Sequence, residues 1–182
     1  IQGPDAAEFL NRIYINGWKS LKVGGCRYGL MLGEDGMVFD DGVTARLNNE
    51  HFHMTTTTGG AAHVLDWLEN WSQTEWPDLH VYCTSTTEQW AVAAICGPNA
   101  RALLHELSPD WDLSPEAFPH MTWQDGSVDG IAARVFRIGF TGELSFEINV
   151  PAGHGMALWN ALITAGEKYG ITPFGTEAMH VL

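Results

Sequence analysis

Two adjacent carboxylates, Asp40 and Asp41, interrupt a segment that otherwise alternates like a β-strand, GMVFDDGVTARL at residues 36–47. Aspartate is depleted in strands because its side chain competes for backbone hydrogen bonds. A carboxylate that faces a pocket can instead take a proton from a reacting group, which is general-base chemistry. The pair is therefore either an acidic turn or part of a site.

Strand alternation separates the two acids. It places Asp41 on the face of Val43, Ala45 and Leu47, and Asp40 on the opposite face. A carboxylate on an apolar face costs free energy unless it is paired or borders a cavity. We therefore expect Asp41, rather than Asp40, to be the working residue.

A further carboxylate, Glu147, lies in the segment RIGFTGELSFEINV at residues 137–150. If residues 144–150 are extended, Phe146 and Ile148 share one face and Glu147 lies on the other. A glutamate there is either solvated on an open sheet, or lines a cavity and accepts paired hydrogen bonds from a ligand. The spacing alone leaves both interpretations open.

Short strands and helices separated by turn sequences must position these residues. We expect strands at 26–32, 37–47, 51–58, 80–88, 89–96 and 144–150, a hairpin over 121–140, and helices at 3–13, 61–76, 97–107 and 154–169. Because hairpins dominate, the sequence predicts an α+β fold of mainly antiparallel sheets with flanking helices. Neither a GxGxxG nor a GxxxxGK[ST] motif is present, so nothing indicates a Rossmann or P-loop nucleotide site.

Two Gly-Pro helices suggest an internal repeat. GPDAAEFLNRI at 3–13 and GPNARALLHEL at 97–107 each place proline at a helix start, followed by apolar residues at helical spacing. We expect two related ferredoxin-like or Greek-key halves, about 1–96 and 97–182.

The composition bears on partners and location. A formal net charge of −13 disfavours nucleic acid and anionic membranes. Cys26, Cys83 and Cys96 lack CxxC spacing, which favours reduced thiols over a disulfide framework. The histidines lack carboxylate partners at ligand spacing, so we expect no metal site. There is no apolar run that could cross a bilayer and no signal pattern, and we expect a cytoplasmic protein.

Four segments in order carry a resemblance: GMVFDDGVTARL, MTTTTGGAAHVLDWLE, RIGFTGELSFEINV and YGITPFGTEAMHVL. Together they resemble the folate-binding aminomethyltransferase family, whose best-known member is the glycine-cleavage T-protein. The resemblance covers nearly the whole chain. It is strongest to the C-terminal half of the alpha subunit of heterotetrameric sarcosine oxidase. Because members of that kind continue on both sides, we expect this chain to be part of a longer subunit.

The resemblance implies roles for four residues. Asp41 matches the catalytic aspartate that contacts folate near N10, and Glu147 matches the glutamate that binds the pterin ring. Phe140 replaces a tyrosine of the pterin pocket, which leaves stacking without the hydroxyl. Thr57 matches a folate-contacting asparagine. Met179 stands where the T-protein has an arginine that serves that enzyme's own substrate, and this argues against a T-protein proper.

The function implied is transfer of a one-carbon unit from oxidised sarcosine to tetrahydrofolate, giving 5,10-methylenetetrahydrofolate. Flavin and NAD would lie in other parts of the parent enzyme, and the partners would be folate and the other subunits of a hetero-oligomeric oxidase. Folate's anionic glutamate tail needs a basic contact, and Arg46, Arg134 and Arg137 are candidates. The alternatives are a folate domain of the dimethylglycine or sarcosine dehydrogenase type and a non-catalytic scaffold module.

Overall fold

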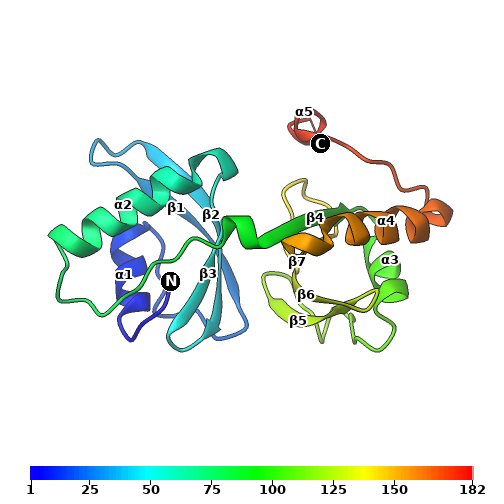
Figure 1. Cartoon of the computed structure of the whole chain (residues 1–182), viewed down its shortest axis with the longest axis horizontal. Helices are drawn as coiled ribbons and strands as arrows, with labels where there is room; N and C mark the ends of the chain where they lie inside the picture. Colours follow the sequence, from blue (N-terminus) through cyan, green and yellow to red (C-terminus); the bar gives the residue numbers. More distant parts are fainter. Residues whose placement is uncertain (182) are drawn as a thin grey trace. The chain divides into compact units, whose positions relative to one another are not determined.

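The computed structural model describes residues 1–181 and is drawn in Figure 1. The chain divides into two compact units, Ile1–Thr87 and Glu88–Leu182. Each unit carries an antiparallel sheet with helices, so the fold is α+β. The sequence assigned strand β4 (Trp90–Cys96) to the first half, whereas in the structure it belongs to the second unit.

The first unit packs its helices on one face of a sheet with strand order β1-β2-β3. Its elements are α1 Ala6–Ile13, β1 Cys26–Leu32, β2 Val38–Asn48, β3 His51–Met54, a 3-10 turn η1 Thr58–Gly60 and α2 Ala61–Thr74. Helix α1 repeats apolar residues at a spacing of three to four, which gives it one buried face. Phe9 and Leu10 of this face are fully buried in a cluster that includes Met31 and Phe52 of the sheet.

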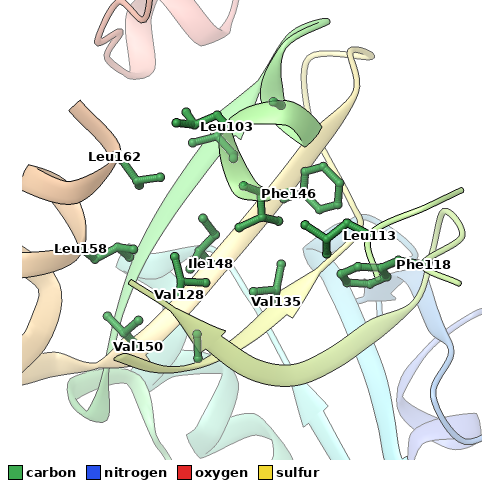
Figure 2. Packing of buried hydrophobic residues seen from close by; sticks show 14 residues of the cluster. Leu103, Leu113, Phe118, Val128, Val135, Phe146, Ile148, Val150, Leu158 and Leu162 are labelled. Carbon is green, nitrogen blue, oxygen red and sulfur yellow. The ribbon is translucent and has the colours of Figure 1, made fainter. Parts of the chain in front are cut away.

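The second unit has a sheet of strand order β4-β7-β6-β5. Its elements are η2 Thr87–Gln89, β4 Trp90–Cys96, α3 Ala100–Leu107, β5 Trp123–Val128, β6 Ile131–Phe136, β7 Ser145–Pro151, η3 Ala152–His154, α4 Gly155–Gly166, η4 Glu167–Tyr169 and α5 Thr176–Met179. Figure 2 shows the core, in which Leu103 of α3 and Leu158 of α4 face Val135, Phe146 and Ile148 of the sheet. The opposite face of this sheet carries Glu147.

The two units share one connectivity. Each runs from an extended residue or strand through a Gly-Pro helix, three antiparallel strands, a 3-10 turn and a second helix. In the first unit the extended segment is reduced to Gln2, which forms an antiparallel bridge to His51 at the start of β3. The order Gln2-β3-β2-β1 therefore matches β4-β7-β6-β5.

Hydrogen bonds repeat between the units along with the connectivity. The amide of Gly3 donates to Glu50 O over 2.9 Å, and that of Gly97 donates to Leu144 O over 2.9 Å. The guanidinium of Arg46 lies 5.2 Å from the ring centre of Phe52, and that of Arg137 lies 5.2 Å from the ring centre of Phe146. The two Gly-Pro helices therefore occupy equivalent places within their units.

The strand predicted at residues 80–88 is absent from the described residues, so this prediction is wrong. Tyr82 forms only an isolated bridge to Gln2. The pairing stops there because Gly3 and Pro4, which follow Gln2, turn the chain into the helix and offer no continuing ladder.

Candidate functional site

Asp41 lies on the face of its sheet opposite the helices. In the β1–β2 register Leu30 is opposite Asp41 and Tyr28 is opposite Val43, so all four side chains share one face. The Tyr28 hydroxyl donates a hydrogen bond of 2.5 Å to Asp41 Oδ2. This bond raises the pKa of Tyr28, because the phenol must keep its proton to donate it. Asp41 is thus a half-buried carboxylate oriented by a tyrosine.

Asp40 has different surroundings. Its side chain lies on the helix-covered face with Met31 and is only 8% exposed. Asp40 Oδ1 accepts hydrogen bonds from the amides of Asp41, at 2.7 Å, and of Thr57, at 3.0 Å. A Cβ on Gly60 would lie 2.8 Å from Asp40 Oδ2, so glycine leaves the room that this carboxylate needs. The buried acid therefore fixes the backbone of β2 and of the loop before η1.

Strand alternation correctly predicts that the two acids lie on opposite faces, but the prediction that the face of Asp41 is the core face is wrong. The face of Asp41, Val43 and Ala45 is not the one that packs on α1; that face includes Met31 and Phe52. Alternation fixes which residues share a face, but it does not say which face a helix covers. Asp41 is therefore a half-buried acid on the face without helices, and Asp40 is the buried one.

Thr57 lies at the end of the loop that leads into η1, and its side chain is exposed. Its amide binds Asp40, and its carbonyl accepts a hydrogen bond from the amide of Gly60 over 2.9 Å. Thr57 and Asp41 are thus held by the same carboxylate. The first unit brings these two predicted residues together through Asp40.

Tyr28 is a site residue that the sequence pattern did not indicate. The turn at residues 33–36 alone does not give its position, because a bulge between Met31 and Leu32 shifts the hairpin register by one residue. With that shift, Leu30 lies opposite Asp41, and Tyr28 lies two residues farther along the same face, within reach of Asp41.

Glu147 projects from β7 on the face opposite Phe146 and Ile148, as the alternation predicts. Ala94 of β4 and Phe136 of β6 flank it across the sheet. Burial raises the pKa of Glu147. Among the described residues its carboxylate has no hydrogen-bond or ion-pair partner, so both oxygens are available to donors of a ligand.

Aromatic rings and one arginine share this face with Glu147. Arg134 lies opposite Asn149 in the register, with its guanidinium 5.7 Å from the ring centre of Trp90 and 4.9 Å from that of Trp123. It also binds Asp125, through Nε at 2.8 Å and Nη2 at 2.9 Å. The surface around Glu147 therefore combines flat apolar rings with one cation.

The other two candidate arginines are placed differently. Arg46 donates to three backbone carbonyls, those of Leu21, Asn48 and Asn49. Arg137 stacks on Phe146, whose ring belongs to the helix-packed core, and burial lowers the pKa of Arg137. Of the three arginines, Arg134 alone shares the face of Glu147.

Phe140 is not placed in a shared cavity with Glu147. It lies in the β6–β7 loop with its side chain 68% exposed, and its ring centre is 6.5 Å from that of His180. A groove of about 640 Å³ in the second unit is lined by neither residue. Phe140 and Glu147 belong to the second unit, whereas Asp41 and Thr57 belong to the first.

Within residues 1–181, no group of three or more His, Cys, Asp or Glu side chains could hold a metal ion. The helices of the same residues include none with the length and apolar character to span a membrane.

Comparison with known proteins defines the class. The family described as "GCVT N-terminal domain" matches residues 1–182, so the chain belongs to that family. Its fold is also that of aminomethyltransferase T of the glycine cleavage system from Bartonella henselae, with a TM-score of 0.75 and 27% identity, over 89% of this chain and 41% of that one. A chain of heterotetrameric sarcosine oxidase from Corynebacterium sp. U-96 shares the fold at a TM-score of 0.67 and 18% identity, over 96% of this chain and 80% of that one.

Comparison with proteins of similar sequence narrows the class further. Over its whole length the chain is 57% identical to sarcosine oxidase subunit alpha from Corynebacterium sp. (strain U-96), of which it spans only 19%. It is 32% identical to aminomethyltransferase from Chloroherpeton thalassium, of which it spans 48%. It is 30% identical to mitochondrial dimethylglycine dehydrogenase from Homo sapiens, of which it spans 20%. The chain thus corresponds to about a fifth of the sarcosine oxidase subunit.

Proposed function

We propose that this chain is the folate-binding part of a sarcosine oxidase alpha subunit. In this role it transfers the one-carbon unit of oxidised sarcosine to tetrahydrofolate, giving 5,10-methylenetetrahydrofolate. The observation that carries the proposal is the 57% identity to a sarcosine oxidase alpha subunit over the whole chain. The dehydrogenation itself, with its flavin and NAD, would take place in other parts of a hetero-oligomeric enzyme.

The residues around Glu147 suit a reduced folate. The pterin ring presents neighbouring N–H donors, and the unpaired carboxylate of Glu147 can accept two of them in a charge-assisted arrangement. The half-buried Trp90 and Trp123 supply flat apolar surface on the same face. Arg134 is our candidate for the anionic glutamate tail, because its partner Asp125 is largely exposed and can be released to water.

Asp41 is our candidate general base. Tetrahydrofolate supplies two nucleophilic nitrogens, and closure of the one-carbon unit onto N10 requires removal of a proton there. A carboxylate held by Tyr28 can take that proton and can stabilise transient positive charge beside it. General-base help of this kind contributes about 10²–10⁴-fold in rate. In this scheme Thr57 contributes a polar contact and Phe140 contributes stacking.

Dimethylglycine dehydrogenase is the second candidate, supported by 30% identity over the whole chain. A non-catalytic scaffold is a third possibility, but a scaffold needs neither Asp41 nor Glu147. The lower identity ranks the dehydrogenase below sarcosine oxidase.

The test is product analysis with the intact protein. Sarcosine and dimethylglycine are supplied separately, with and without saturating tetrahydrofolate, and formaldehyde and 5,10-methylenetetrahydrofolate are measured. We expect sarcosine to be oxidised and folate to divert product from formaldehyde to the methylene derivative. Preference for dimethylglycine would favour the second candidate, and formaldehyde unaffected by folate would rule out the transfer role.

A further inference from the structure

Strand β4 has an open edge. In the described part of the chain it pairs with β7 on one side, and no strand or isolated bridge pairs with its other side. The strand WAVAAIC has no charge, no proline and no bulge along its ladder with β7. Native proteins usually protect sheet edges with such devices, or cover them. An edge without any of them is suited to accept another strand.

The equivalent edge in the first unit is covered. There Gln2 takes the place of β4, and its outer side pairs with Tyr82, which follows the second helix of that unit. The Gln2 amide donates to Tyr82 O over 2.9 Å, and the Tyr82 amide donates to Gln2 O over 2.7 Å. The neighbouring His80 also exchanges hydrogen bonds with Asp5, giving its amide to Asp5 Oδ2 over 2.8 Å.

The second unit contains the corresponding segment, Ile171–Phe174, directly after its second helix. Leu79 and Ile171 are equivalent, because each is partly buried against its unit's core and follows the turn that ends the helix. Phe174 lies three residues after Ile171, as Tyr82 lies three residues after Leu79, so Phe174 is the counterpart of Tyr82. Residues 172–174 are exposed and pair with no strand in the structure, and they line the same groove as β4.

We propose that the free edge of β4 is a docking site for the chain's own segment Ile171–Phe174, which joins the sheet as an outer strand. Phe174 then exchanges two backbone hydrogen bonds with Cys96, as Tyr82 does with Gln2. Thr172 pairs with Asn99, as His80 does with Asp5.

Gly97 supports this assignment. Gly3 and Gly97 both have positive φ, at 130° and 109°. In the first unit a Cβ on Gly3 would lie 2.1 Å from His80 O, so the docked segment requires glycine there. The space beside Gly97 is open in the structure, and it is the space that the Thr172 carbonyl fills on docking.

Pro173 is compatible with an outer strand. Its counterpart is Val81, whose amide donates to Leu79 O rather than to Gln2. A proline at this position therefore removes no bond of the pairing, and prolines within sheets are confined to such edges.

The groove has the chemistry of a strand site rather than of a polar ligand site. Its volume is about 640 Å³, and none of its lining residues is Asp, Glu, Lys or Arg in a chain of net charge −13. The apolar side chains of Ile171 and Phe174 match this lining. Closure by the chain's own residues leaves the folate site to the other face of the sheet.

Disulfide trapping in the intact protein tests the docking. Two residues that exchange both backbone hydrogen bonds lie about 5.5 Å apart at Cα, within the range that a disulfide spans. Phe174→Cys is oxidised with diamide and the products are mapped by peptide mass spectrometry. We expect more than half of the molecules to link position 174 to Cys96. Pro173→Cys is the matched control, because its side chain points to the other face and is expected not to link.

A calibration variant and a label-free measurement make the outcome decisive. Gln2→Cys combined with Tyr82→Cys reports the yield for a pair that is docked in the structure. If that pair links and Phe174→Cys does not, or if Phe174→Cys links only between two molecules, the proposal is wrong. In the unmodified protein, the amides of Ala94 and Cys96 face the free edge. If the segment docks, the protection factor of the Cys96 amide should be within about tenfold of that of the Ile95 amide, which faces β7. Fast exchange of the Cys96 amide would contradict the proposal.

Discussion

Asp40 and Asp41 are neighbours in the chain, but their carboxylates perform different tasks. Asp40 is buried and accepts two backbone amides, so its charge serves the local structure. Asp41 reaches the face without helices, where the Tyr28 hydroxyl donates a hydrogen bond to it. A hydrogen bond from a neutral donor orients a carboxylate without neutralising it. The arrangement leaves Asp41 as the acid that can act on a ligand.

Asp41→Asn should therefore affect transfer more than oxidation. Asparagine keeps the shape and a hydrogen-bonding oxygen but cannot take a proton at neutral pH. In the intact protein, sarcosine oxidation should continue while product shifts from 5,10-methylenetetrahydrofolate toward formaldehyde, with transfer about 10²-fold slower. Product partition at saturating folate is the measurement. Glu34→Gln, in the exposed β1–β2 turn, is the matched control, and an Asp41→Asn partition equal to that of the control would remove Asp41 from the mechanism.

Glu147→Gln should weaken folate binding. The glutamine amide keeps one acceptor oxygen but loses the negative charge and the second acceptor oxygen. We expect the binding free energy of folate to weaken by about 1.5–3 kcal/mol, which raises Kd roughly ten- to hundredfold. Titration of tetrahydrofolate into the intact protein measures this. Glu143→Gln, in the preceding loop, is the control, and equal dissociation constants for both variants would exclude Glu147 from the site.

The same substitution should change how stability depends on pH. Burial raises the pKa of Glu147 in the folded state, so between the unfolded and folded pKa values the native protein binds more protons than the unfolded one. This glutamate therefore lowers the free energy of unfolding as pH rises through that window. Glu147→Gln should be more stable than the parent at pH 7, and the difference should shrink as pH falls below the pKa of an unfolded glutamate. Denaturant unfolding at both pH values measures it, and a difference of the opposite sign would contradict the role of burial.

At the scale of elements, strand β2 depends on one close approach. A Cβ on Gly42 would lie 2.0 Å from Thr55 O. Thr55 is held close to β2, because its amide donates a hydrogen bond to Val43 O over 3.0 Å. Gly42→Ala must separate β2 from the chain that follows β3. We expect it to lower the free energy of unfolding by about 1–3 kcal/mol. Gly59→Ala, where a Cβ meets nothing within 4 Å, is the control, and equal stability of both variants would contradict the close contact.

Much of the element pattern was predictable from the sequence, because helical and strand periodicities are local. The α1, α2, α3 and α4 helices lie within their predicted ranges, and β1 matches its predicted range. Residues 80–88 were mistaken for a strand because alternating polar and apolar residues do not reveal whether a partner strand exists. Strand alternation likewise does not show which face of a sheet the helices cover, because this depends on tertiary packing. For this reason Asp41 was predicted on the core face, whereas the structure places Asp40 there. The contact of Tyr28 with Asp41 depends on a bulge between Met31 and Leu32, which the turn sequence does not reveal, and the exposure of Phe140 depends on tertiary packing.

At the scale of the whole molecule, each unit has its own core. The largest buried clusters contain residues of one unit only. Phe146→Ala removes a fully buried ring from the second core and should cost about 3–5 kcal/mol. Hydrogen exchange should show the loss of protection concentrated in residues 88–181. Equal loss of protection throughout residues 1–87 would show that the units unfold as one.

The repeated connectivity also bears on ancestry. Two units with the same Gly-Pro turn and the same arginine over the same phenylalanine are the expected remains of a gene duplication. In the shared framework His53 is the counterpart of Glu147, and Ala132 is the counterpart of Asp41. Each unit thus has one of the two acids and a different residue at the place of the other. A duplicated ancestor can specialise in this way, since a second copy frees the first from serving both roles.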